Sequence, residues 1–206
     1  MVTLVAPPKR RPEGEVQTFH FSDGTTLCVN YDQDFNPRTE YDNAATMICF
    51  HRRYRLGDKH DYKSEDFGGW DELRERLEAD FEPVFIAPLY LYDHGGLSIS
   101  TGDFHDRWDS GPVGFVLVSK EKALEEWGDK NGEVTAHVRE MAEKVAKGEV
   151  EDYDTHLRGE NYHIAFYDAD GKLKDCCGGI LGRDHVPEAV NDVAGEEYAK
   201  VMEEKW

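Results

Sequence analysis

Apolar and polar residues alternate along two stretches of the chain, one near each end. Residues 16–31 predict a β-hairpin, because Phe19 and Phe21 alternate with polar neighbours and Ser22-Asp23-Gly24 supplies a turn. Residues 161–181 show the same pattern around an Asp-Ala-Asp-Gly turn. These stretches predict strands that pair locally and antiparallel.

Between and after the hairpins, apolar residues recur every three or four positions, which predicts helices. The expected helices span about Trp70–Ala79, Ser119–Trp127, Val134–Lys147 (ended by Gly148) and Pro187–Glu204. Apolar runs predict further strands at 46–54, at 83–92 with a break at Pro88, and at Leu97–Thr101 and Val113–Val118, the last three as a meander. The expected class is α+β, a mostly antiparallel sheet built from hairpins with three to four helices packed against it.

The length of 206 residues and a hydrophobic content of 39% favour a single packed core. Residues 1–15 are expected to be a flexible arm, and 16–206 a single α+β domain that includes a loop at 32–45. No internal repeat or low-complexity linker interrupts this stretch.

The formal net charge is −19, from 24 basic and 43 acidic residues. Three readings compete: simple solubility, adaptation to a saline cytoplasm or a GC-rich host, and imitation of nucleic acid toward a basic site on another protein. Direct binding to duplex DNA is disfavoured, because affinity for DNA depends on Lys and Arg neutralising phosphates. Binding to an anionic membrane surface is disfavoured for the same reason.

The cysteines are Cys28, Cys49, Cys176 and Cys177, and none shows C-x-x-C spacing. Cysteines of this kind suit a reducing compartment. No apolar run has the length of a signal peptide or a membrane span, so we expect a cytoplasmic protein of the host cell.

Several apparent ligand motifs fail on chemistry. The stretch from Asp32 begins like a calcium loop, but Pro37 stands where glycine is needed and Asn43 where a bidentate Glu is needed. Gly178-Gly179-x-x-Gly182 lacks the dinucleotide fingerprint, and no H-x-x-x-H pair signals zinc. We therefore predict no cofactor and no metal.

Three polar clusters remain as candidates for ligand binding. They are Asp42, Asn43, His51, Arg52, Arg53, Tyr54 and Asp58; then Tyr92, Asp93 and His94; then Trp108, Asp109 and Ser110. Adjacent arginines at a strand end anchor carboxylates or hold an anionic ligand. An Asp-His pair supplies either a turn or a base, and a Trp in a tight loop is a possible contact anchor. No catalytic residue is assigned.

The same stretches carry a resemblance to a family. The matching motifs are Asn36-Pro37-Arg38, Asp42-Asn43, His51-Arg52-Arg53-Tyr54-x-Leu56-Gly57-Asp58, Leu91-Tyr92-Asp93-His94-Gly95-Gly96 and Trp108-Asp109-Ser110-Gly111-x-Val113-Gly114-Phe115. Over about residues 30–175 the chain resembles an uncharacterised protein family of bacteriophages, archaeal viruses, plasmids and other mobile elements. The resemblance implies a mobile-element origin and no established activity.

Charge and resemblance together suggest a non-enzymatic accessory protein that binds and modulates a host protein or defence system. Two routes are open: an acidic face that mimics nucleic acid, or a pocket near Arg52, Arg53 and His94 that sequesters a nucleotide or other small anion. The alternative is a metal-dependent hydrolase or nuclease that uses His51, Asp58, Asp93, His94 and Asp109. A third reading is a structural or assembly component.

Overall fold

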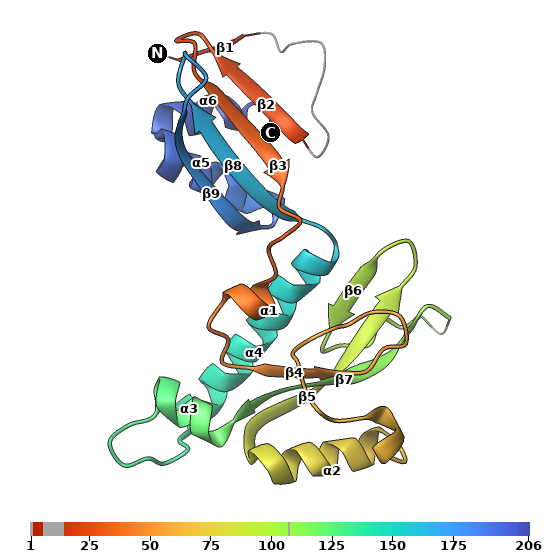
Figure 1. Cartoon of the computed structure of the whole chain (residues 1–206). Coiled ribbons are helices and arrows are strands. Elements are labelled where there is room, and N and C mark those ends of the chain that lie inside the picture. The colour runs from red at the N-terminus through yellow and green to blue at the C-terminus, as the bar shows by residue number, and fades with distance from the viewer. Residues whose placement is uncertain (1, 6–14, 107) are drawn as a thin grey trace. The chain divides into compact units, whose positions relative to one another are not determined.

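The computed structural model describes residues 2–5, 15–106 and 108–206, and the chain forms two compact units. Unit 1 comprises Met1–Asn36 and Gly159–Trp206, and unit 2 comprises Pro37–Arg158 (Figure 1). The single domain expected over 16–206 is thus replaced by two units, each with its own apolar core. Unit 2 is inserted into unit 1, and no linker composition marks either crossing point in the sequence.

Unit 1 is an antiparallel sheet with two helices on one face. Its strand order is β1-β2-β3-β8-β9, with strands β1 (Leu4–Val5), β2 (Glu15–Phe21), β3 (Thr26–Tyr31), β8 (Asn161–Tyr167) and β9 (Leu173–Leu181). A short 3₁₀ turn η2 (Arg183–His185) leads to α5 (Val186–Ala194) and α6 (Glu196–Glu203). Alternate strand residues such as Phe19, Val29 and Ile164 pack against Val190 and Met202 of the helices.

Both predicted hairpins of unit 1 are confirmed, because β2 pairs with β3 and β8 with β9. The arm prediction is wrong for its first residues: Leu4 pairs with Phe21, and Val2 is buried. Residues 6–14 of that arm lie outside the described residues. The predicted last helix is two helices, because Gly195 at φ +106° interrupts it.

Unit 2 has a second antiparallel sheet, in the order β4-β7-β5-β6, with helices on both faces. The strands are β4 (Thr46–Cys49), β5 (Pro83–Asp93), β6 (Leu97–Ser100) and β7 (Ser110–Ser119). The helices are α1 (Pro37–Glu40), a 3₁₀ turn η1 (Ser64–Asp66), α2 (Trp70–Phe81), α3 (Lys120–Trp127) and α4 (Ala136–Leu157). The α+β class with antiparallel sheets is confirmed.

Helices on both faces explain why the run from Val113 to Val118 is apolar without alternation. Val116 and Val118 face the core under α4, whereas Phe115 and Leu117 face the core under α2. Every residue of the run is buried.

Several predicted limits within unit 2 differ from the structure. The expected meander is wrong, because β7 pairs with β5 rather than with β6. The strand expected at 46–54 ends at Cys49. Strand β5 runs through Pro88, and α4 continues past Gly148 because Val150 and Tyr153 bury their side chains in the core.

Two glycines of the motifs that carry the family resemblance are needed for packing. A Cβ on Gly114 would lie 1.9 Å from the Ile48 carbonyl oxygen, so β4 and β7 approach closely only with glycine there. Gly57 has φ +67°, and a Cβ there would meet the Met47 carbonyl oxygen at 2.5 Å. These positions allow the close packing at the β4 edge of the sheet.

Candidate functional site

Three of the sequence motifs meet at one end of the unit 2 sheet. The pairing of β5 with β7 places Tyr92 opposite Ser110, and the backbone N–H of Asp93 donates to the Asp109 carbonyl at 2.8 Å. The backbone N–H of Phe50 donates to the Val113 carbonyl at 2.8 Å, which brings in the segment after β4. We call the following residues the strand-end cluster: His51, Arg52, Arg53, Tyr54, Tyr92, Asp93, His94, Trp108, Asp109 and Ser110.

Two ion pairs join the motifs side chain to side chain. The Arg53 guanidinium pairs with the Asp93 carboxylate, and the Arg53 side chain remains 65% exposed. His94 Nδ1 lies 3.0 Å from the Asp109 carboxylate. Both pairs orient a group that is able to bind an anion while leaving part of its surface open to solvent.

Aromatic rings lie beside these charges. The rings of His51 and Tyr54 stack with centroids 5.0 Å apart, and the Arg53 guanidinium carbon lies 5.2 Å from the centre of the Tyr54 ring. His51 Nδ1 accepts the backbone N–H of Tyr54 at 3.2 Å, so the ring proton of neutral His51 sits on Nε2. The Tyr54 ring and the planar guanidinium together form a stacking surface.

Trp108 projects from a turn that Asp106 stabilises. The Asp106 carboxylate accepts the backbone N–H of Trp108 at 2.8 Å and that of Asp109 at 3.0 Å, and Ser110 donates its hydroxyl to the Asp106 carbonyl at 2.5 Å. These backbone hydrogen bonds hold the pKa of Asp106 below its ordinary value, with a smaller contribution from the charge of His94. Trp108 is 94% exposed.

An exposed Trp whose backbone is held by hydrogen bonds presents a large ring surface to a ligand. Asp106 was missed from the sequence. The sequence does place Asp106 two residues before Trp108, and an Asp side chain at this spacing commonly accepts the backbone N–H of the later residue.

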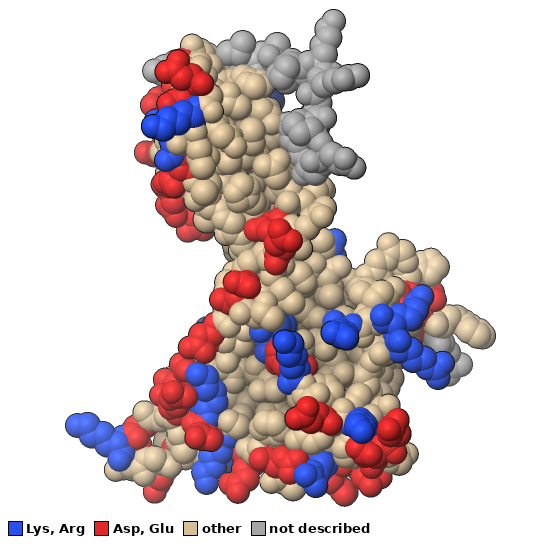
Figure 2. Space-filling view, in the orientation of Figure 1, with Lys and Arg blue, Asp and Glu red and all other residues tan. Residues whose placement is uncertain are grey.

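Arginines gather at this cluster of an acidic protein, although Asp93 and Asp109 balance the charges of Arg52 and Arg53 within it. Arg52, Arg53 and Arg55 are all exposed within four residues. Lys and Arg side chains gather at this end of unit 2 in Figure 2, whereas carboxylates dominate its lower edge. Cationic and aromatic groups together suit a ligand that carries both negative charge and a flat ring.

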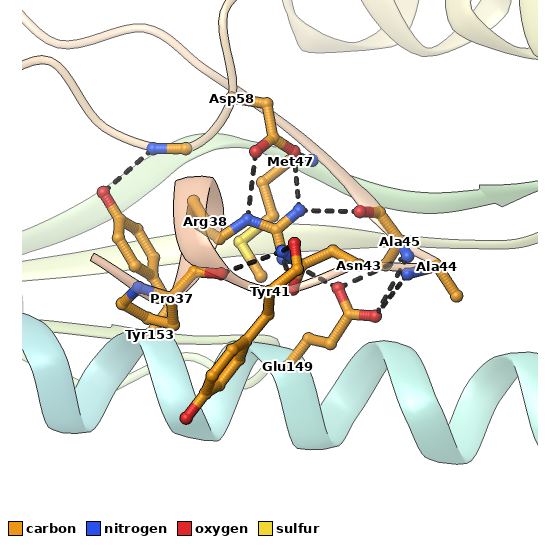
Figure 3. Close-up of polar contacts among 11 residues, drawn as sticks. Pro37, Arg38, Tyr41, Asn43, Ala44, Ala45, Met47, Asp58, Glu149 and Tyr153 are labelled. Atoms are coloured by element: carbon orange, nitrogen blue, oxygen red, sulfur yellow. Dashed lines mark hydrogen bonds and ion pairs between the residues drawn. The ribbon is translucent and has the colours of Figure 1, made fainter. Parts of the chain in front are cut away.

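Asp42, Asn43 and Asp58 do not join this cluster. Asp42 is almost fully exposed and lies 3.7 Å from Lys122. Asn43 and Asp58 instead bind Arg38, whose side chain is buried at the junction of α1, β4 and α4 (Figure 3). The structure thus gives these three residues contacts other than His51 and Arg53, with which the sequence had grouped them.

The Arg38 guanidinium uses all five of its N–H groups within unit 2. It donates to both Asp58 oxygens, to Asn43 Oδ1, to Glu149 Oε2 and to the Ala45 carbonyl, at distances from 2.6 to 3.0 Å. Burial acts to lower the pKa of Arg38, but the hydrogen bonds and charges of Asp58 and Glu149 hold it above its ordinary value. A saturated guanidinium has no donor left for a ligand, so this network is structural.

The carboxylates of this network also bind the backbone. Asp58 accepts the N–H of Met47 at 2.7 Å, and Glu149 accepts the N–H of Ala44 at 2.8 Å (Figure 3). Arg38 and Glu149 were not singled out as site residues from the sequence, because 111 positions separate them.

The described part of the chain was compared with the metal site that a metal-dependent enzyme would need. No group of three or more His, Cys, Asp or Glu side chains there is placed to hold a metal ion. Asp58, one of the ligands considered for such a site, is committed to Arg38. Burial, with the charge of Asp58, raises the pKa of the Cys49 thiol to about 12, so Cys49 is not a thiolate nucleophile at neutral pH.

No family model matches this chain, and neither a curated protein nor a solved structure is significantly similar to it. Among the helices of the described residues, none combines the length and apolar character needed to cross a membrane.

Proposed function

We propose that this chain is a non-catalytic accessory protein of a virus or mobile element that binds a nucleotide-class anion at the strand-end cluster. Binding would sequester a nucleotide signal and so modulate a defence system of the host. One observation carries the proposal: Arg53, His94 and Trp108, from three separate motifs, converge on one sheet end with cationic and aromatic surface exposed.

Each group has a defined part in this proposal. The guanidinium of Arg53 and the protonated ring of His94 would donate hydrogen bonds to phosphate oxygens, since both are held by carboxylates. Tyr54 or Trp108 would stack on the base. The net charge of −19 repels anions elsewhere on the protein, so the exposed Arg52, Arg53 and Arg55 offer an anion a selective place to bind.

Thermal unfolding with nucleotides tests the proposal. Linear and cyclic nucleotides should raise the melting temperature, because a ligand at 100 times its Kd stabilises the folded state by about 2.7 kcal/mol. Inorganic phosphate alone should give a smaller shift, since it lacks the ring that stacks. Calorimetric titration then measures Kd for the nucleotide with the largest shift.

Substitutions locate the binding site. Arg53→Gln and Trp108→Ala should each weaken binding about tenfold, equivalent to about 1.4 kcal/mol. Arg74→Gln is the matched control, because Arg74 is an exposed arginine on α2 paired only with Glu78 among the described residues. Equal affinities in Arg53→Gln and Arg74→Gln, or no shift with any nucleotide, would refute the proposal.

A further inference from the structure

A groove separate from the strand-end cluster runs along one edge of unit 2. It has a volume of about 970 Å³ and lies between α2, the edge strand β4 and the segment 59–67. Apolar side chains from all three parts line it, namely Ile48, Tyr62, Phe67 and Phe81. The groove thus offers an apolar and aromatic lining on a strongly polar protein.

Carboxylates surround this lining. Asp61, Asp66 and Glu75 line the groove and are exposed, and their carboxylates have no hydrogen-bond or ion-pair partner among the described residues. Two basic residues also line the groove, Lys59 and Arg76. The Arg76 guanidinium already pairs with the Asp80 carboxylate at 2.7 Å. Asp and Glu side chains gather over α2 in the lower part of Figure 2.

His60, one of the residues that line the groove, has a ring nitrogen without a hydrogen-bond partner among the described residues. His60 Nε2 lies 3.1 Å from the Cys49 carbonyl oxygen, so Nε2 carries the ring proton and Nδ1 is left as an acceptor. Nδ1 is buried and has no hydrogen-bond partner in the described part of the chain. A buried acceptor without a donor is costly, and because solvent does not reach Nδ1, the inference depends on the charge and lining of the groove instead.

We propose that this groove binds an arginine- or lysine-bearing segment of a partner protein. Unpaired carboxylates match the charge of such a side chain, and the lining of Tyr62 and Phe67 suits its aliphatic stem and a cation–π contact. An anionic nucleotide is repelled by the same carboxylates, so this site differs in chemistry from the strand-end cluster. The inference does not depend on nucleotide binding.

Fluorescence anisotropy with a labelled peptide of four Gly-Arg repeats tests this inference at about 150 mM salt, where distant charges are screened. The variant Asp61→Asn, Asp66→Asn, Glu75→Gln should weaken peptide binding at least tenfold. A matched triple variant, Glu140→Gln, Glu188→Gln, Glu203→Gln, removes the same charge from exposed positions on α4, α5 and α6. It should change the affinity less than twofold.

A second variant removes an aromatic side chain from the groove and leaves its charge unchanged. Phe67→Ala should weaken the peptide several-fold, and its melting temperature shows whether unit 2 remains folded. Equal losses in the two triple variants would mean that only net charge attracts the peptide, and the inference would fail. It would also fail if neither Phe67→Ala nor the groove triple changed the affinity.

Discussion

The guanidinium of Arg38 and the carboxylate of Asp58 bind each other through two parallel hydrogen bonds inside unit 2. Arg38 Nε donates to one Asp58 oxygen at 3.0 Å and a terminal nitrogen donates to the other at 2.6 Å. The Arg38 side chain is 2% exposed, so its charge has little access to water. Removing one partner of a buried pair leaves the other uncompensated.

We therefore predict that Asp58→Asn lowers the free energy of unfolding of unit 2 by about 3 kcal/mol. Asp42→Asn is the control, because Asp42 is solvent-exposed and should change stability by less than about 0.5 kcal/mol. Urea denaturation followed by tryptophan fluorescence measures both, since Trp70, Trp108 and Trp127 all belong to unit 2. Similar losses for the two variants would contradict the structural role of Asp58.

The ion pair of Arg53 and Asp93 predicts that removing the Asp93 charge raises the affinity for a nucleotide. Asp93 neutralises Arg53 in the free protein and would compete with a phosphate for the guanidinium. Asp93→Asn should therefore tighten nucleotide binding about threefold, whereas Arg53→Gln weakens it. Calorimetric titration compares the two, with Asp103→Asn as a control carboxylate outside the cluster. Weaker binding in Asp93→Asn would mean that the ion pair itself shapes the site.

The sequence predicts those parts of the fold whose contacts lie within a few residues of one another along the chain. The hairpins of unit 1 and the helix from Trp70 follow from alternation and helical spacing within a few residues. The pairing of β5 with β7 was not predicted, because no local pattern indicates which strand lies next to which. The insertion of one unit into another leaves no compositional mark at Asn36 or Gly159.

The candidate site shows the same limit. The motifs of Arg53, His94 and Trp108 were found from residue types, but their convergence required the register of β5 against β7. Asn43 and Asp58 were assigned to a ligand because Arg52 and Arg53 are near them in sequence. Their partner in the structure is Arg38. The last of its N–H groups is bound by Glu149 of α4, which is 111 positions away in the sequence.

Cysteine reactivity should differ sharply between the two units. Burial raises the pKa of Cys49 to about 12, whereas Cys176 is exposed on β9. We predict that iodoacetamide modifies Cys176 in the folded protein at neutral pH and modifies Cys49 only after unfolding. Mass spectrometry of peptides from native and denatured protein measures this, with Cys176→Ser as the control. Rapid native modification of Cys49 would contradict its burial.

Acid stability of unit 1 should depend on the hydrogen bond from Tyr198 to Asp23, 2.6 Å long. This bond, with others from Thr25, lowers the pKa of Asp23 below its ordinary 3.8. A carboxyl whose pKa is lower in the folded state adds stability above the unfolded value, and that stability is lost as pH falls through the folded value.

The variant Tyr198→Phe keeps the ring that packs on Phe21 and Phe166, with ring centres 4.9 Å apart in both pairs, and removes only the hydroxyl. Near pH 6 it should be less stable than the natural chain by at most about 1 kcal/mol, because Asp23 is exposed and solvent screens the interaction. The difference should shrink as the pH falls through the folded pKa of Asp23, below which Asp23 is protonated in both proteins. Guanidinium denaturation followed by circular dichroism measures it, with Tyr31→Phe as the control. A deficit that stays constant from pH 6 to pH 2 would show that Tyr198 acts through packing alone.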